Sequence, residues 1–515
     1  MRSRRMIGAV IVGGWSVAAV GLYCCTSLSG LDDKVFDLGS GGAGAGSSTG
    51  GSGGIDSPYK LAEPGWAVRF GGNGDETAAA VAVGPSGEIA VVGYFEGTLP
   101  LPGDCSQSNT NAGKLRIFIA KLNGPEDCAW SKSFGEFTEV PELDVAINGN
   151  GHIFVVGGFD GIIAANELTP TASHTSENHD AFFIEYEANG DFANDPEIYG
   201  GSGSQRLSGV AIGEDDNVFV VGHYELSFDL KGACNVQPFE NGPADNVVVA
   251  QFGPAGTCQY AKGFDVDKEQ FGKAVAPGND GAVVFTGFTR GEMSFEIEGG
   301  APFLYPEDGG DGADQDIYVA QIKLNPFEHQ WSHRWGDTAW QEGRSVAVHP
   351  DTGDVFVTGR LGGTAVFADG GAQGSDGDDD AFLVRLSSDG GIQYGRSFGA
   401  PSTTQLGETV LPRPNGAVLL GGTYGGTLHC SGHDIGPAAR AIFLARFGPD
   451  GTPEQCQSLT GSQTFVFADM AASGPQSVVL FGHFTEELTF GNIVLTSAAS
   501  SQDLFLAEVD LHPGL

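Results

Sequence analysis

The sequence predicts an all-β fold built from one internal repeat. Glycine is abundant, with 82 residues among 515, and no long stretch carries apolar residues at helical spacing. A short apolar strand that ends in glycine recurs along the chain. Its seven copies end at Gly93, Gly157, Gly222, Gly287, Gly359, Gly421 and Gly482. Because successive copies lie 61 to 72 residues apart, one repeated unit organises the chain from residue 59 to residue 515.

Each unit contains four predicted strands. Small and β-branched residues precede the glycine-ended strand, as in AVAV near Val81 and KAVA near Val275, and they suit the crowded axis of a ring. A third strand follows a longer connection, as in IFIAKL from Ile117. A fourth carries an aromatic residue, as in WAVRFG at Trp66 and WSHRWG at Trp331. This inventory predicts a seven-bladed β-propeller of four-stranded blades.

The phase of the repeat predicts how the ring closes. The body begins with a fourth-strand motif at Trp66 and ends just after a third-strand motif at residues 504–509. The last blade therefore lacks an outer strand of its own. We predict that residues 66–70 supply it by pairing beside residues 504–508, so that no sheet edge is left open at the seam.

The repeated motifs resemble those of a known bacterial family. The glycine-ended strand, the D-A-F-hydrophobic strand and the W-x-x-x-F-G strand are similar to the bacterial seven-bladed β-propeller repeat proteins. The resemblance covers nearly all of residues 59–515. It implies a propeller fold and an envelope or extracellular setting, and it assigns no catalytic residues because the motifs are structural.

The N-terminal residues 1–25 have the pattern of an export signal, with three arginines followed by an uncharged apolar stretch from Met6 to Tyr23. An uncleaved anchor is the alternative. Leu22, Cys24 and Cys25 resemble the acceptor site of bacterial lipoproteins, which predicts lipidation of one cysteine, with simple secretion as the alternative. Residues 26–58 form a Gly/Ser-rich flexible linker. The predicted location is the outer membrane or cell surface, otherwise the periplasm or the medium.

The formal net charge of −40 makes nucleic acid an unlikely partner, because the field repels phosphate. It also disfavours anionic membrane surfaces, so we expect membrane contact only through a lipid anchor. Solubility of an exported monomer explains such acidity, and a cation-binding role is the alternative.

Six cysteines fall into three pairs at equivalent positions of the repeat. This pattern predicts three disulfides, each worth ~3 kcal/mol, in an oxidising compartment. The pairs are Cys105 with Cys128, Cys234 with Cys258, and Cys430 with Cys456.

Repeated aspartates precede the third strand, and a turn-holding role is the expected one. Two of the adjoining loops are denser in carboxylates and are candidates for a calcium site, although the twelve-residue calcium loop pattern is absent. No other cofactor is expected. The repeated residues are Asp180, Asp316, Asp380 and Asp503, and the candidate calcium ligands are Asp308, Asp311, Asp314, Asp376, Asp378 and Asp380.

The sequence shows no catalytic constellation. It favours a surface-displayed binding scaffold for a protein or glycan partner, because the long connections between second and third strands differ from unit to unit. A polysaccharide-acting enzyme is the alternative, with Glu342, Glu408 and the acidic loops converging as paired carboxylates in a central channel. His223 and His483 follow the second-strand glycine and are expected at exposed strand ends, where they either shape a binding surface or vary neutrally.

Overall fold

The computed structural model describes most of the repeat region. The described residues are 62–111, 113–137, 142–164, 167, 174–201, 203–232, 234–236, 244–254, 256–264, 268–291, 293–295, 303–304, 315–368, 371–374, 379–400, 403–430, 433–461, 465–498 and 501–511. The predicted export signal, Cys24, Cys25 and the linker lie outside them.

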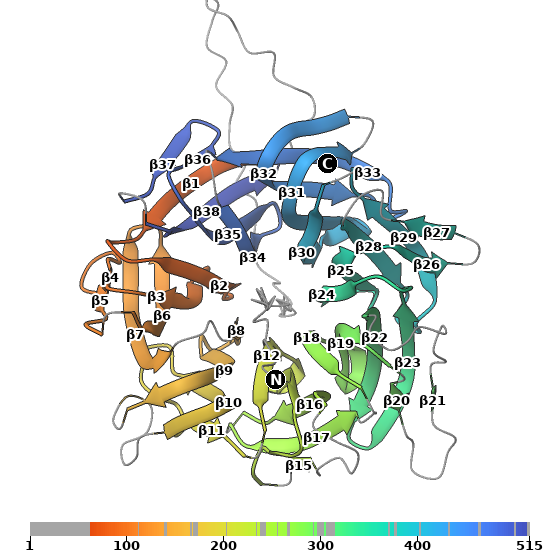
Figure 1. Cartoon of the computed structure of the whole chain (residues 1–515), viewed down its shortest axis with the longest axis horizontal. Helices are drawn as coiled ribbons and strands as arrows, with labels where there is room; N and C mark the ends of the chain where they lie inside the picture. Colours follow the sequence, from red (N-terminus) through yellow and green to blue (C-terminus); the bar gives the residue numbers. More distant parts are fainter. Residues whose placement is uncertain are drawn as a thin grey trace, which may run out of the picture.

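The predicted all-β class is confirmed. The described part of the chain contains no α-helix, and its sheets are antiparallel and arranged around a central axis in a propeller-like fold (Figure 1). Three short 3₁₀ turns interrupt the strands: η1 (Glu214–Asp216), η2 (Asn279–Gly281) and η3 (Pro414–Gly416). No helix within these described ranges is long and apolar enough to cross a membrane.

The strands that face the axis follow one another around it (Figure 1). Each contacts the next in chain order, and β34 contacts β2. They are β2 (Glu76–Val83), β8 (Leu143–Ile147), β12 (Gln205–Ile212), β18 (Gln270–Pro277), β24 (Gln341–Val348), β30 (Gln405–Pro412) and β34 (Phe465–Gly474).

A second strand pairs with each inner strand, a third with the second, and a fourth lies outermost. The second strands are β3 (Ile89–Phe95), β9 (Ile153–Ile163), β13 (Val218–Tyr224), β19 (Ala282–Thr289), β25 (Val355–Leu361), β31 (Val418–Cys430) and β35 (Ser477–Phe484). The third are β6 (Leu115–Gly124), β10 (His174–Tyr186), β16 (Asn246–Phe252), β22 (Asp316–Leu324), β28 (Asp380–Leu386), β32 (His433–Phe447) and β38 (Asp503–Leu511). The outermost are β7 (Asp127–Phe137), β11 (Glu197–Tyr199), β17 (Cys258–Phe264), β23 (Phe327–Trp335), β29 (Ile392–Phe398), β33 (Pro453–Gly461) and β1 (Ala62–Phe70).

The N-terminal strand β1 pairs with the C-terminal strand β38. Trp66 lies opposite Glu508 and Phe70 opposite Leu504, which are the partners that the sequence predicts. The indole nitrogen of Trp66 donates to Glu508 Oε2 at 2.8 Å, and Arg69 forms an ion pair with Asp503. The two ends of the repeat region therefore share one sheet of order β1-β38-β35-β34.

The sheets are less separate than the sequence predicts. The end of β7 pairs with the end of β9, with Glu136 opposite Ile162, so two predicted blades merge into one larger sheet. The end of β33 likewise pairs with β36, with Thr460 opposite Thr489.

The long connections between second and third strands carry small hairpins. Their strands are β4 (Thr98–Leu99) with β5 (Gln107–Ser108), β14 (Phe228–Asp229) with β15 (Asn235–Val236), β20 (Ser294–Phe295) with β21 (Phe303–Leu304), β26 (Thr364–Ala368) with β27 (Gly371–Gly374), and β36 (Glu487–Phe490) with β37 (Ile493–Thr496).

The recurrent glycines are required by close approach of the backbone. A Cβ at Gly222 would lie 2.0 Å from the carbonyl oxygen of Arg206, and one at Gly359 would lie 2.0 Å from that of Glu342. In the sixth repeat this position belongs to Gly422, which lies opposite Gly407. The strand pattern that ends at Gly421 therefore predicts the position of this glycine one residue too early. Two adjacent glycines make the register ambiguous in the sequence.

The core lies between facing sheets. Val92 of β3 and Ile117 of β6 belong to the same buried cluster as Val145 of β8 and Val155 of β9. The second strands are buried along their whole length where they are covered on both faces, as in β3 and β13. This burial explains their continuous apolar sequence.

Candidate functional site

A cluster of charged side chains lies at the inner strands, and it begins with a repeated irregularity. β12, β18, β24 and β30 each carry a register shift, which leaves one extra residue unpaired with the neighbouring strand. The extra residues are Ser208, Lys273, Arg344 and Glu408.

The cluster is a chain of alternating charges that runs from Glu142, which directly precedes β8, to β18, β24 and β30. Lys273 Nζ donates to Glu142 Oε1 at 2.9 Å and lies 3.7 Å from Glu342 Oε1. Arg344 Nε donates to Glu342 Oε2 at 3.1 Å, and its Nη1 donates to both oxygens of Glu408, at 2.9 and 2.8 Å. All five residues are buried. We call them the axial charge chain.

The pKa shifts of the first pair agree with a buried ion pair. Burial alone would raise the pKa of Glu142, but Lys273, His223, Arg206 and a hydrogen bond from Ser208 together outweigh burial and hold that pKa well below its ordinary value. Burial alone would lower the pKa of Lys273, and Glu142 and Glu342 instead raise it. Both groups are therefore charged at neutral pH.

Hydrogen bonds to the backbone of neighbouring inner strands add to these links. Asp144 Oδ2 accepts from the backbone N–H of Val210 at 2.8 Å, and Asp469 Oδ2 accepts from that of Val81 at 3.1 Å. Thr409 donates to Asp469 Oδ1 at 3.0 Å. Together with the axial charge chain, these bonds connect inner strands that are far apart in sequence.

The two histidines are not at exposed strand ends, and that expectation is wrong. His223 is 1% exposed and His483 is 4% exposed. His223 Nδ1 lies 3.8 Å from Glu142 Oε2, and His483 Nδ1 accepts from the backbone N–H of Ala78 at 3.2 Å. Burial lowers the pKa of each imidazole to about 3, so both are neutral at pH 7. They fill the interior where inner and second strands meet.

Glu342 and Glu408 do come together, but they meet at a shared arginine. The Arg344 guanidinium bridges the two carboxylates, which are 8% and 3% exposed. A general acid and base need a carboxylate that can reach substrate and exchange a proton. The bridged geometry instead suits a structural ion pair.

The repeated aspartates lie against the glycine that follows the fourth strand. A Cβ at Gly336 would lie 1.9 Å from Asp316 Oδ1, and one at Gly399 would lie 1.8 Å from Asp380 Oδ1. Asp316 also accepts from Arg334 Nε at 2.6 Å. The F-G part of the fourth-strand motif is thus explained by the carboxylate packed over the glycine.

The candidate calcium site falls mostly beyond what the structure describes. Asp308, Asp311, Asp314, Asp376 and Asp378 lie outside the described residues, and Asp380 is buried beneath Gly399. Within the described residues no group of three or more His, Cys, Asp or Glu is placed to hold a metal ion. Calcium binding stays a prediction.

Two of the predicted disulfides are confirmed. Cys105 bonds to Cys128 and Cys234 bonds to Cys258. Cys456 is also disulfide-bonded, while the side chain of Cys430 lies outside the described residues, so their pairing stays a prediction. Two such bonds are typical of an oxidising, extracellular compartment.

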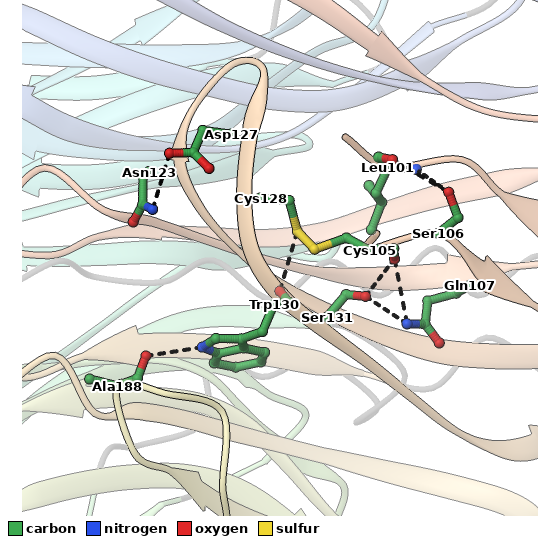
Figure 2. Close-up of a disulfide and its surroundings, with 10 residues drawn as sticks. All are labelled: Leu101, Cys105, Ser106, Gln107, Asn123, Asp127, Cys128, Trp130, Ser131 and Ala188. Atoms are coloured by element: carbon green, nitrogen blue, oxygen red, sulfur yellow. Dashed lines mark hydrogen bonds between the residues drawn. A yellow bond between two sulfur atoms is a disulfide. The ribbon is translucent and has the colours of Figure 1, made fainter. Parts of the chain in front are cut away.

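The first disulfide fixes a hydrogen-bonded loop against β7 (Figure 2). Gln107 Nε2 donates to Ser131 Oγ at 2.6 Å, and Ser131 Oγ donates to the carbonyl of Cys105 at 2.5 Å. Trp130 Nε1 donates to the carbonyl of Ala188 on the neighbouring repeat at 3.1 Å.

We predict that Cys105→Ser/Cys128→Ser lowers the free energy of unfolding by ~3 kcal/mol, because an open loop gains entropy in the unfolded chain. Denaturant melts of parent and variant measure the difference. A reducing agent should destabilise the parent and affect the variant less; equal stability of the two oxidised proteins would contradict the prediction.

Glu76 is a buried carboxyl where four other repeats place glutamine. Gln205, Gln270, Gln341 and Gln405 begin their inner strands as Glu76 begins β2. Burial, with Asp503 and Asp75 nearby, raises the pKa of Glu76 to about 8, although a bond from the Gly72 N–H opposes the shift. Because the folded pKa is raised, the stability that the protonated acid contributes is complete below pH ~4.5 and is lost as pH rises through about 8.

Glu76→Gln should therefore stabilise the protein at pH 8 by on the order of 1–3 kcal/mol and leave it nearly unchanged at pH 5. Thermal melts of both proteins between these pH values measure the effect. Asp245, whose pKa burial raises to about 7, adds a pH dependence common to both proteins, so the difference between the curves is the readout. Parallel curves would refute the assignment.

Among the described residues, two large aromatic side chains are exposed. Trp340, between β23 and β24, is 48% exposed, and Phe192 is 41% exposed and stacks on Tyr186. Phe192 borders a groove of about 460 Å³. The other groove residues are Gln107, Ser131, Lys132, Ser133, Phe134, Glu167, Tyr186, Gly190 and Asp191.

No protein-family model matches the chain, and no curated protein matches it. Solved structures that are similar include a protein of unknown function from Dyadobacter fermentans, with a TM-score of 0.38 and 11% identity over 88% of this chain and 99% of that one. Virginiamycin B lyase from Staphylococcus aureus has a TM-score of 0.41 and 8% identity, over 87% and 99%. An α-L-arabinofuranosidase from Fusarium graminearum has 0.37 and 10%, over 71% and 93%. Similarities this low carry no argument about function.

Proposed function

We propose that the chain is an exported, seven-bladed β-propeller that serves as a binding scaffold for a protein or glycan partner at the cell envelope or outside the cell. In this proposal β1 supplies the outer strand of the last blade and closes the ring. The contacts between successive inner strands and the pairing of β1 with β38 support closure. Lipidation at Cys24 or Cys25 would hold the scaffold at a membrane.

The burial and pairing of the charged residues near the axis is the observation that favours a scaffold. Glu142, Lys273, Glu342, Arg344 and Glu408 are buried and paired with one another, so their charges are directed at neighbouring strands rather than at solvent. The exposed groups with unusual chemistry are instead aromatic, at Trp340 and Phe192. Exposed aromatic side chains are typical of recognition surfaces.

A binding screen of the full chain against a glycan array and a set of purified envelope and extracellular proteins tests the proposal. We expect saturable binding to at least one ligand, weakened by substitution of an exposed aromatic residue. Hydrolysis of a bound glycan, lost on Glu342→Gln or Glu408→Gln in a protein that remains folded, would contradict a scaffold role and indicate an enzyme.

A further inference from the structure

Trp340 is a large aromatic residue at a place where a repeat does not need one. It directly precedes β24, where Asp75, Ser204, Glu269 and Thr404 precede the inner strands of four other repeats. Those residues are polar, and Trp340 leaves about half of its surface in solvent, at 48% exposed. Packing of the blade therefore does not explain the indole.

The backbone around Trp340 is fixed. Its carbonyl accepts from the N–H of Gly362 at 2.9 Å, and the residue forms a parallel bridge with Gln315. Asp337 Oδ1 accepts from the N–H of Ala339 at 2.9 Å and from Gln341 Nε2 at 2.8 Å. An aromatic ring on such a turn is held in place before any ligand arrives.

The side chain of Arg360 stacks on the indole of Trp340. The guanidinium carbon of Arg360 lies 4.2 Å from the ring centroid, and Arg360 Nε donates to Asp379 Oδ1 at 2.7 Å. Stacking by a paired arginine covers part of the ring and leaves the exposed remainder available. The charges of Arg360 and Asp379 cancel; Asp379 is buried, whereas part of the Arg360 side chain stays exposed beside the ring.

The surroundings narrow the class of ligand. A cation would compete with Arg360 for the ring, and an aromatic cage needs further rings beside the first. A nucleic acid is repelled by the net charge of −40. A protein hot spot needs apolar neighbours that exclude water, whereas the described neighbours Asp337, Arg360 and Asp379 are charged. A neutral sugar offers polarised C–H groups to the ring face and hydroxyls to the polar groups at its edge.

We propose that Trp340 is the stacking platform of a saccharide-binding site, with Arg360 as a hydrogen-bonding group for the hydroxyls of a neutral pyranose ring. This inference rests on the proposed scaffold function and names the ligand class for one of its surfaces.

Calorimetric titration of the full chain with cellohexaose, chitohexaose, maltohexaose and mannohexaose tests the site. We expect at least one of them to bind, Trp340→Ala to weaken that binding at least ~10-fold, which corresponds to about 1.4 kcal/mol, and Trp340→Phe to weaken it less, because a smaller aromatic face remains for stacking. The control is Val494→Ala, which shortens an apolar residue of β37 in another repeat that is 53% exposed, and it should leave the affinity unchanged.

The outcomes separate the two claims. Binding that survives Trp340→Ala, or is lost on Val494→Ala, overturns the assignment of the site while the scaffold function stands. No binding to any hexasaccharide or to a glycan array, with a purified protein ligand still bound, overturns the saccharide class alone. Absence of both kinds of ligand would overturn the scaffold function as well.

Discussion

A chain lacking residues 60–72 should lose cooperative unfolding or melt at least ~10 °C below the parent, because β38 then keeps only β35 as a partner and its other edge is exposed to water. The deletion removes the bond from Trp66 to Glu508, the ion pair from Arg69 to Asp503, and the buried ring of Phe70. Thermal melts followed by circular dichroism measure the change.

The control deletion removes residues 26–58, which carry the linker and leave β1 intact. Its melting temperature should lie within about 2 °C of the parent, since no described strand is lost. A chain without residues 60–72 that melts like this control would show that β1 does not stabilise the ring.

Lys273→Met should destabilise the protein by about 3–5 kcal/mol, because it leaves Glu142 buried without its closest cation. The lysine is 2.9 Å from Glu142 Oε1 and is buried together with it. Denaturant unfolding of parent and variant at pH 7 gives the difference in free energy.

Two further variants make this result specific. Lys231→Met removes an exposed lysine paired with Glu197 and should cost no more than about 1 kcal/mol. Glu142→Gln combined with Lys273→Met removes the orphaned charge and should recover part of the loss. Equal effects of Lys273→Met and Lys231→Met would mean that the axial charge chain does not stabilise the inner strands.

The sequence predicts the strand order well because each strand class has its own pattern. The second strand needs a glycine because a carbonyl of the inner strand approaches it closely, and the F-G motif needs one because an aspartate packs over it. The repeated glycines therefore report the backbone geometry. Extra pairing between β7 and β9 was not predictable, because neither strand end differs in composition from an ordinary strand end.

The axial charge chain was missed although a signal was present. Three consecutive repeats read GKAV, GRSV and GETV, so a charged residue interrupts an otherwise small and apolar strand. That residue is the extra one at each register shift. Sequence alone does not reveal that the three charges meet Glu142 and Glu342, because the partners come from different repeats and depend on closure around an axis.

The sequence also marks Trp340 as unusual, because the equivalent position is polar in four other repeats. Its exposure depends on the turn held by Asp337 and on the stacking of Arg360, which only three-dimensional structure reveals. The sequence carries no such signal for the two histidines. Their position at the end of a second strand gives no indication that neighbouring strands bury them.

Hydrogen exchange of the intact chain measures ring closure most directly. Closure by β1 predicts that the amides of residues 62–70 that bond to β38 exchange as slowly as those in residues 503–511 and become exposed at the same denaturant concentration, because the two strands share one ladder. Fast exchange of residues 62–70 beside a protected β38 would contradict a ring closed by its N-terminal strand.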